Sequence, residues 1–378
     1  MTSNSLLLGT APARALLPTY ARQDVTFVSG DGAWLTDAQG RRYLDFLAGI
    51  AVVGLGHRHP APLAAAQAQL ERLWHVSNLY WTQPMLELAE RLSERFGGAQ
   101  AFFCNSGAES IEAALKYARK ATGKPGIVAL EGSFHGRTLG ALSVTGQAVK
   151  RAAFEPLVPG VTFARPNDID SLGAAVGANT GCILLEPVLG EGGVRTLEPE
   201  FLAAARTLAD ETGGLLIFDE VQTGVGRTGT FFAFEQLDVR PDAATLAKGL
   251  ANGLPIGCLL VADERAEAFE PGDHASTFGG NPVACAAAVA VCDTIDDGLL
   301  SSVQAQSARI ADRLPGVRGR GLLLAVELDR PAGDVVAACL ERGLVVGTAS
   351  ATSLRLTPPL TLTTEELDQG LAILEEVL

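Results

Sequence analysis

Two residues of this 378-residue chain could together do covalent and acid–base chemistry, Asp219 and Lys248. Asp219 follows the apolar run 215–218, which does not alternate and so predicts a strand buried on both faces of a parallel sheet. An acid at the carboxyl end of such a strand points into the crevice where open α/β sheets bind ligands. Lys248 has no charged neighbour for several residues. An amine in such a setting is readily deprotonated, which suits Schiff-base chemistry.

The remaining lysines all fit structural roles. The alternative for Lys248, before any partner is considered, is an ordinary solvated lysine. The others are Lys116 and Lys120, four apart on one face of a predicted helix, Lys124 in a Gly/Pro turn, and Lys150 beside Arg151.

A junction between a predicted strand and a predicted helix at 105–109 offers a site for one phosphate. Gly107 lets the backbone approach a ligand, and the free amides of the helix start can bind phosphate oxygens together with the Ser106 hydroxyl. The alternative for Ser106 is an ordinary helix N-cap. Ser276 and Thr277 precede two glycines and form either a turn or a second phosphate contact.

One cofactor uses an amine, a single phosphate site and a buried acid together, namely pyridoxal 5′-phosphate. The acid would keep the pyridine nitrogen protonated, so that the ring can absorb the electrons left when a substrate C–H proton departs. Lys248 would hold the cofactor aldehyde and, once displaced by the substrate amine, would shuttle that proton.

The elements around these residues predict an α/β fold. Buried strands alternate with loops and helices from about residue 99 to residue 295, which implies a mostly parallel sheet wrapped by helices. After Asp297 the pattern predicts a small α+β domain, with a strand at 322–328, helices at 334–342 and 365–378, and strands near Leu344 and Leu354. The expected large-domain strands are 101–104, 127–131, 182–186, 215–219, 243–246 and 256–261, and the expected helices include 62–73, 84–96, 108–122, 199–212 and 281–295.

Composition and charge exclude several classes of protein. The net charge of −14 and the pI of about 4.9 argue against nucleic acid or an anionic membrane as the main partner. No stretch has the apolar length of a transmembrane helix, and the Leu6–Leu8 triplet is too short for a secretion signal. The six cysteines are scattered without CxxC spacing, which predicts small core residues of a cytoplasmic protein.

Competing site motifs match poorly. The apolar run ending in Asp219 resembles a Walker B strand, but the GxxxxGK[ST] loop that an ATPase needs is missing. A GxGxxG match at 224–229 leads into an aromatic run where a dinucleotide fold would open a helix. No metal is expected, because the histidines lack HExxH spacing and cysteine support. A serine hydrolase is disfavoured, because there is no GxSxG elbow.

With these motifs in place, the chain resembles the class-III aminotransferases of fold type I, and within them the acetylornithine aminotransferases. The resemblance runs from about Pro18 to Leu378. It is carried by LDFLAGIAV from Leu44, LGHRHP from Leu55, SNLYW from Ser77, FFCNSGAES from Phe102, SFHGRTLGALSVTGQ from Ser133, EPVLGEGGV from Glu186, LLIFDEVQTGVGRTG from Leu215, TLAKGL from Thr245 and PGDHASTFGGNPVACAAA from Pro271.

The resemblance implies roles for residues around the cofactor. Lys248 resembles the Schiff-base lysine and Asp219 the partner of the pyridine nitrogen. The remaining cofactor contacts implied are Gln222 at the ring hydroxyl, Val221 beneath the ring, Phe134 stacked on its other face, Ser106, Gly107 and Ala108 around the phosphate, and Thr277 completing that cup from the neighbouring subunit of a homodimer.

The resemblance also implies two substrate arginines. Arg137, with Ser276 nearby, would hold the distant carboxylate of the amino donor. Arg355 would grip the α-carboxylate of glutamate, with Glu191 as the acid that pairs it when another substrate is present. Arginine suits both roles because it binds a carboxylate through two parallel hydrogen bonds. Without the resemblance, a structural ion pair for Arg355 and a loop cap for Arg137 would be the default interpretations.

The fold implied is a large domain at 50–290 with a seven-stranded sheet, a small domain at 291–378, and an N-terminal segment at 1–49 packed on the small domain. The activity implied is transfer of the δ-amino group of N-acetylornithine to 2-oxoglutarate, giving the semialdehyde and glutamate in arginine biosynthesis. Val53 and Trp81 depart from the family pattern near the expected substrate channel and leave the donor open. The alternative donors are ornithine, N-acetyllysine, succinylornithine, succinyldiaminopimelate and 4-aminobutyrate, and the alternative outside the family is a nucleotide-binding ATPase.

Overall fold

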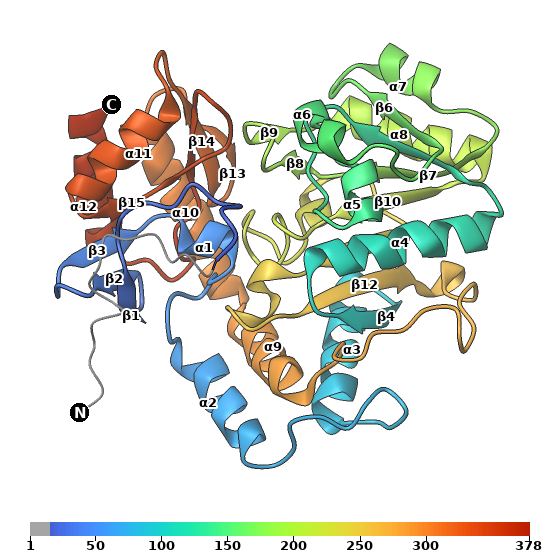
Figure 1. Ribbon diagram of the computed structural model, residues 1–378, viewed down its shortest axis with the longest axis horizontal. Coiled ribbons are helices and arrows are strands. Elements are labelled where there is room, and N and C mark those ends of the chain that lie inside the picture. Colours follow the sequence, from blue (N-terminus) through green and yellow to red (C-terminus); the bar gives the residue numbers. More distant parts are fainter. Residues whose placement is uncertain (1–15) are drawn as a thin grey trace.

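A computed structural model of the protein describes residues 16–378 (Figure 1). The Leu6–Leu8 triplet and the first fifteen residues of the expected N-terminal segment lie outside these residues. The centre of the molecule is a seven-stranded sheet in the order β4-β12-β11-β10-β7-β5-β6. Its strands are β4 Ala99–Cys104, β12 Gly257–Ala262, β11 Ala243–Leu246, β10 Leu215–Asp219, β7 Thr180–Leu185, β5 Gly126–Leu130 and β6 Val161–Ala164.

This sheet is parallel except for β12, which runs antiparallel to both of its neighbours, β11 and β4. All five residues of β10 are buried. Leu216 and Phe218 belong to the core on one face of the sheet, and Leu215 and Ile217 to the core on the other. This explains why the run shows no alternation of apolar and polar residues.

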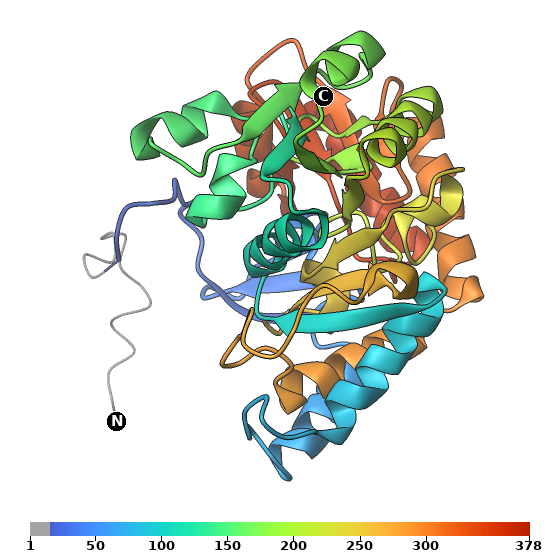
Figure 2. The same cartoon turned by 90° about the vertical axis from the view of Figure 1, so that its right-hand side faces the viewer.

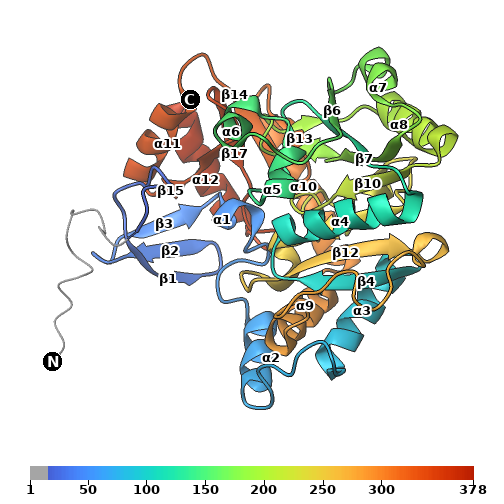
Figure 3. The same cartoon turned by 45° about the vertical axis from the view of Figure 1, so that its right-hand side comes forward.

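Helices cover both faces of the sheet. Figure 3 shows α4 on one side of β12 and β4, with α3 and α9 on the other. Figure 2 shows α2, α3 and α9 gathered at one end of the molecule. The helices of this region are α2 Pro60–Leu70, α3 Gln83–Phe96, α4 Gly107–Thr122, α5 Leu139–Ser143, α6 Ala148–Arg151, α7 Ile169–Ala175, α8 Pro199–Thr212 and α9 Pro282–Thr294.

Short elements complete this region. The hairpin β8–β9 follows β7, and the 3-10 turn η4 begins at Lys248, separated by one residue from the end of β11. Their bounds are β8 Val188–Leu189, β9 Arg195–Thr196, η2 Ala152–Phe154, η3 Ala233–Gln236, η4 Lys248–Ala251 and η5 Asp263–Arg265.

The C-terminal part is a small α+β unit around the antiparallel sheet β13-β14-β17-β16. It has its own core, which includes Phe46 from the N-terminal part and Leu371 from α12. Its elements are α10 Asp297–Arg313, β13 Arg318–Arg320, β14 Leu323–Glu327, α11 Ala332–Glu341, β15 Leu344–Val345, β16 Gly347–Thr348, β17 Ser353–Leu356 and α12 Thr364–Val377.

The N-terminal strands lie beside this unit, because β3 pairs in parallel with β15 in the sheet β1-β2-β3-β15 (Figure 1). Their bounds, with the short helix that follows, are β1 Phe27–Asp31, β2 Trp34–Asp37, β3 Arg42–Asp45 and α1 Ala48–Ala51.

The predicted α/β fold is therefore confirmed, including the mostly parallel sheet and the small C-terminal α+β part. The six strands predicted for the large domain lie within one or two residues of the observed ones. The seventh strand, β6, did not emerge from the pattern, because it is only four residues long and only its last residue, Ala164, is fully buried. Within the described part of the chain, no helix is both long enough and apolar enough to span a bilayer.

Candidate active site

A cavity of about 410 Å³ opens where the parallel strands end. Its walls come from the segments that follow β4, β5, β7, β10 and β11, so one edge of the sheet supplies nearly all of it. This is where open α/β sheets bind ligands. The predicted site residues that line it are Ser106, Gly107, Ala108, Phe134, Arg137, Glu191, Asp219, Val221, Gln222 and Lys248.

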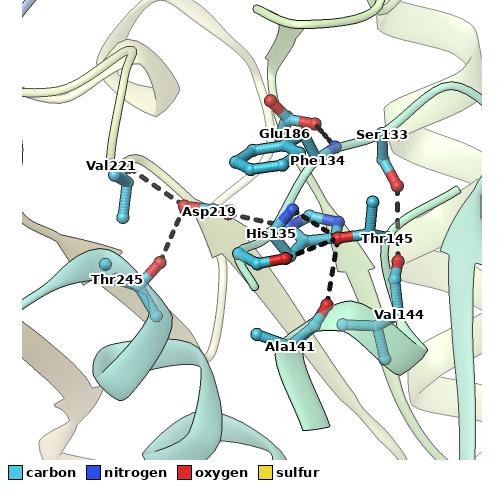
Figure 4. Close-up of polar contacts among 12 residues, drawn as sticks. Ser133, Phe134, His135, Ala141, Val144, Thr145, Glu186, Asp219, Val221 and Thr245 are labelled. Atoms are coloured by element: carbon cyan, nitrogen blue, oxygen red, sulfur yellow. Dashed lines mark hydrogen bonds and ion pairs between the residues drawn. The ribbon is translucent and has the colours of Figure 1, made fainter. Parts of the chain in front are cut away.

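Asp219 is buried at the end of β10, and its carboxylate is held by three donors (Figure 4). The Thr245 hydroxyl and the Val221 amide donate to Oδ1 at 3.0 and 3.1 Å. The other oxygen, Oδ2, lies 2.7 Å from Nδ1 of His135. A buried carboxylate is costly unless it is paired and hydrogen-bonded, so these contacts hold Asp219 in place with its charge toward the cavity.

His135 is fully enclosed, and its contact with Asp219 shifts its pKa. Burial alone would lower the pKa of His135, but the hydrogen bond and charge of Asp219 outweigh it, and the pKa is raised. Its other ring nitrogen, Nε2, is buried without a hydrogen-bond partner among the described residues. The raised pKa favours the protonated ring, which would place a positive charge behind Asp219.

Glu186, at the end of β7, is a second buried acid on the cavity wall. Burial raises its pKa to about 7. Its carboxylate accepts the amides of Phe134 at 2.8 Å and Gly190 at 3.2 Å, and thereby joins the loops that carry these residues. The contact with Phe134 is visible in Figure 4.

Lys248 opens into the same cavity from the first position of η4. Its backbone is in the left-handed region, with φ of 43°, which is unusual for a residue with a side chain and is typical of functional sites. Burial lowers the pKa of Lys248; the Glu191 carboxylate opposes this shift and Arg355 reinforces it. Its amine has no hydrogen-bond partner within residues 16–378. It is therefore free to react.

The start of α4 forms the phosphate-binding end of the cavity. Ser106 is the N-cap, and its hydroxyl accepts the Glu109 amide at 3.2 Å. The amides of Gly107 and Ala108 lie at the positive end of a sixteen-residue helix, which favours an anion. A Cβ added at Gly107 would lie 2.8 Å from Val221 Cγ1, so glycine keeps this approach open.

These residues fit pyridoxal 5′-phosphate in its chemistry. A helix start for the phosphate, an unbonded amine and a buried carboxylate lie on one cavity. In addition, Oε1 of Gln222 is buried without a hydrogen-bond partner in the described chain, which suits a contact to the ring hydroxyl. No group of three or more His, Cys, Asp or Glu side chains in residues 16–378 could hold a metal ion.

Glu191 and Arg355 form an ion pair across the two parts of the molecule. Glu191 lines the cavity, whereas Arg355 lies behind it on β17 and is 3% exposed. Arg355 also donates to the Gly190 carbonyl at 3.4 Å, and its Nε is buried without a partner among described residues. Glu191 must therefore move before Arg355 can reach a ligand in the cavity.

Arg137 lies at the exposed side of the cavity, with its guanidinium 5.6 Å from the centre of the Phe134 ring. Ser276 does not line the cavity, but its hydroxyl accepts the Asn105 side-chain amide at 3.1 Å, and Asn105 does line it. Thr277 lies farther away, in a shallow pocket shared with Tyr80. Within this chain, Thr277 is therefore not part of the phosphate cup.

The two family departures lie away from the cavity wall of this chain. Val52, not Val53, lines the cavity, and Trp81 is 80% exposed in a different hollow near Arg72.

Sequence reasoning missed three residues that form or support the site. His135 was considered only as an isolated metal ligand, and Glu186 and Thr245 only as parts of motifs. Their positions in the sequence could have indicated them. His135 lies between the predicted site residues Phe134 and Arg137, and Glu186 and Thr245 lie at or beside the ends of strands. Nothing in the sequence pointed to Lys150, whose amine lies 4.6 Å from the centre of the Phe134 ring.

Comparison with known proteins agrees with this geometry. Residues 19–378 match the family model for class-III aminotransferases. The acetylornithine aminotransferase of Archaeoglobus fulgidus is 45% identical over 364 residues, which cover 95% of this chain and 97% of that protein.

Two solved structures share the fold. The N-acetylornithine aminotransferase of Stenotrophomonas maltophilia is 37% identical with a TM-score of 0.82, covering 95% of this chain and 96% of that one. The ornithine aminotransferase of Toxoplasma gondii, crystallised with partial occupancy of pyridoxal phosphate at its active site, is 32% identical with a TM-score of 0.91, covering 96% and 92%.

Proposed function

We propose that this protein, which belongs to the class-III aminotransferases of fold type I, transfers the δ-amino group of N2-acetyl-L-ornithine to 2-oxoglutarate. The products are N-acetyl-L-glutamate 5-semialdehyde and L-glutamate, a step of arginine biosynthesis. Pyridoxal 5′-phosphate is the cofactor. The observation that carries the reaction type is the single cavity shared by the unbonded amine of Lys248 and the buried carboxylate of Asp219. The choice of donor rests on the similarity to acetylornithine aminotransferases over nearly the whole chain.

Lys248 is the proposed base. When bound, pyridoxal phosphate supplies the aldehyde that takes up the amino group and the ring that absorbs the electrons released from the substrate carbon. Because its pKa is lowered by burial, more of the Lys248 amine is uncharged near neutral pH than in an ordinary lysine. Its Nζ removes a proton from the donor Cδ, the carbon that bears the transferred amine.

Asp219 is proposed to hold a proton on the pyridine nitrogen, which makes the ring a better electron acceptor. Its contacts with His135 and Thr245 hold the carboxylate in position. Phe134 and Val221 line the cavity on segments that follow different strands, β5 and β10, and are proposed to pack against the two faces of the ring.

Two arginines are proposed to serve two substrates in turn. Arg137 binds the carboxylate that lies far from the reacting carbon in both the donor and glutamate. Glu191 covers Arg355 while the donor is bound, and its displacement would free Arg355 for the α-carboxylate of glutamate. The ion pair of Glu191 and Arg355, with only the acid on the cavity wall, supports this exchange.

The test is kcat/KM for N-acetylornithine, ornithine and N-acetyllysine with 2-oxoglutarate as the acceptor. We expect N-acetylornithine to be preferred over ornithine by at least about tenfold, because a free α-ammonium would be placed near the cations of the site. A clear preference for ornithine or N-acetyllysine would contradict the choice of donor and leave the reaction type intact.

We further propose that two copies form a dimer with shared active sites, working in the cytoplasm. Large apolar side chains are exposed on one loop, with Leu79 at 86% and Trp81 at 80%, and Phe278 is exposed nearby. The Asn78 side chain joins this loop to the one carrying Thr277, through the carbonyls of Ser276 and Gly279. This surface, next to the proposed phosphate contact Thr277, supports a partner that completes the site.

Light scattering after size exclusion tests the dimer, with twice the mass of one chain as the expected result. Leu79→Asp should lower both the dimer fraction and the retention of cofactor. A fully active monomer would contradict the proposal.

A further inference from the structure

The five lysines differ in how their amines are bound. Three of them have partners: Lys116 donates to the Asp273 carbonyl at 2.7 Å, Lys120 is paired with Asp273 and Glu270, and Lys124 donates to the Thr212 carbonyl. Within residues 16–378, the amines of Lys248 and Lys150 have neither a hydrogen bond nor an ion pair. Lys248 has a proposed role in the reaction, and Lys150 has none.

Lys150 is held beside the cavity by the short helix α6. Just before this helix, the Gln147 side chain donates to the carbonyls of Gly132 at 3.1 Å and Glu191 at 3.3 Å. These contacts tie α6 to the loop that carries Glu191. The Lys150 amine lies 4.6 Å from the centre of the Phe134 ring, around which the guanidinium of Arg137 also lies.

The neighbouring cation, Arg151, faces elsewhere. Its guanidinium lies 4.2 Å from the centre of the Phe163 ring and donates to the Thr145 carbonyl. Arg151 is thus bound within the protein, whereas Lys150 is only partly buried and has no anion within ion-pair distance in the described chain.

The charges around Lys150 are those of the substrate site. Burial lowers the pKa of Lys150; the Glu191 carboxylate opposes this shift, and Arg137 and Arg355 reinforce it. With Glu191 paired to Arg355, Arg137 and Lys150 are left as two cations at one side of the cavity. A partly buried cation such as Lys150 is unfavourable without a counter-ion, and a carboxylate bound beside the exposed Arg137 would supply one.

We propose that Lys150 is a specificity residue, which acts with Arg137 to bind the substrate carboxylate that lies far from the reacting carbon. This inference rests on the proposed function. The Lys150 cation would favour substrates that carry a carboxylate far from the reacting carbon over amines that lack one.

The experiment compares two donors that differ only in this carboxylate, N-acetylornithine and N-acetylputrescine. Lys150→Met removes the charge and keeps most of the side chain that packs near Phe134. We expect it to lower kcat/KM for N-acetylornithine about fivefold to tenfold and to change that for N-acetylputrescine less than about twofold. Lys150→Arg should keep the preference for N-acetylornithine, and Lys120→Met, which also removes one surface charge, should behave as wild type.

Binding of glutarate to the holoenzyme, measured by calorimetry, gives a second readout that needs no turnover. Its dissociation constant should rise about fivefold to tenfold in Lys150→Met and stay near the wild-type value in Lys120→Met. An equal decrease in kcat/KM for both donors in Lys150→Met would identify Lys150 as a support for Phe134 and overturn the proposal. Unchanged binding of glutarate would also overturn it. A wild-type preference for another donor would contradict the proposed function alone, because glutarate still reports on Lys150.

Discussion

His135 and Asp219 meet in the interior of the protein, with Nδ1 of the histidine 2.7 Å from Oδ2 of the aspartate. The contact raises the histidine pKa against the opposing effect of burial, which favours a positive charge behind the carboxylate. We predict that His135→Phe lowers kcat about tenfold or more with little change in KM, because Asp219 would lose its partner at Oδ2 and would hold the proton on the cofactor nitrogen less well. Steady-state kinetics checks this, with His135→Asn, which keeps a hydrogen-bond donor, as the milder control. A change confined to KM would speak against this role.

Arg355 should matter for only one of the two half-reactions. We predict that Arg355→Gln lowers kcat/KM for glutamate about a hundredfold, because the bidentate contact proposed for its α-carboxylate would be lost. The half-reaction with N-acetylornithine should change far less, since Glu191 is proposed to stay in place with that donor. Single-turnover kinetics with each substrate separates the two, and Arg137→Gln is the matched control that should weaken both. If Arg355→Gln slowed both half-reactions by the same factor, the proposed displacement of Glu191 from Arg355 would be contradicted.

Glu186 should make stability depend on pH. Burial raises its pKa from 4.5 to about 7 in the folded protein. Below about pH 4.5 the Glu186 carboxyl is protonated in both the folded and the unfolded protein. As the pH rises toward 7, the carboxyl ionises first in the unfolded chain. The contribution of Glu186 to stability is therefore lost over this range. We therefore predict that the free energy of unfolding of Glu186→Gln falls less than that of wild type between about pH 5 and about pH 8, by up to roughly 3 kcal/mol.

Urea unfolding at both pH values measures this difference. Glu327→Gln is the control, because Thr352, Ser353 and Arg318 hold the pKa of Glu327 down to about 2. The contribution of Glu327 to stability is lost only in acid. Glu327→Gln should therefore show the same change in the free energy of unfolding between the two pH values as wild type. An equal decrease in the free energy of unfolding of Glu186→Gln and wild type would show that Glu186 does not titrate in this range.

Local sequence was sufficient for the framework of the site. Asp219 could be predicted because an apolar run without alternation identifies a central strand, and the residue at its end must face the crevice. Ser106 and Gly107 could be predicted because a strand and a helix meet there. In both cases one stretch of chain contains the whole signal.

Contacts between distant segments could not be predicted in the same way. His135 finds its partner 84 residues away, and the ion pair of Glu191 and Arg355 spans 164 residues. The resemblance to a family supplied the second pair but not the first. The position of Lys150 beside the Phe134 ring could not be predicted for the same reason, because its neighbours in sequence say nothing about that ring.

The central claim is that Lys248, and no other lysine, holds the cofactor. Borohydride reduction of the holoenzyme, followed by proteolysis and mass spectrometry, tests it most directly. The account predicts loss of the visible absorption band, a reduced cofactor attached to the peptide that contains Lys248, and no such band or adduct in Lys248→Ala. A cofactor attached to Lys150 or any other lysine, or an active protein that yields no adduct, would contradict it.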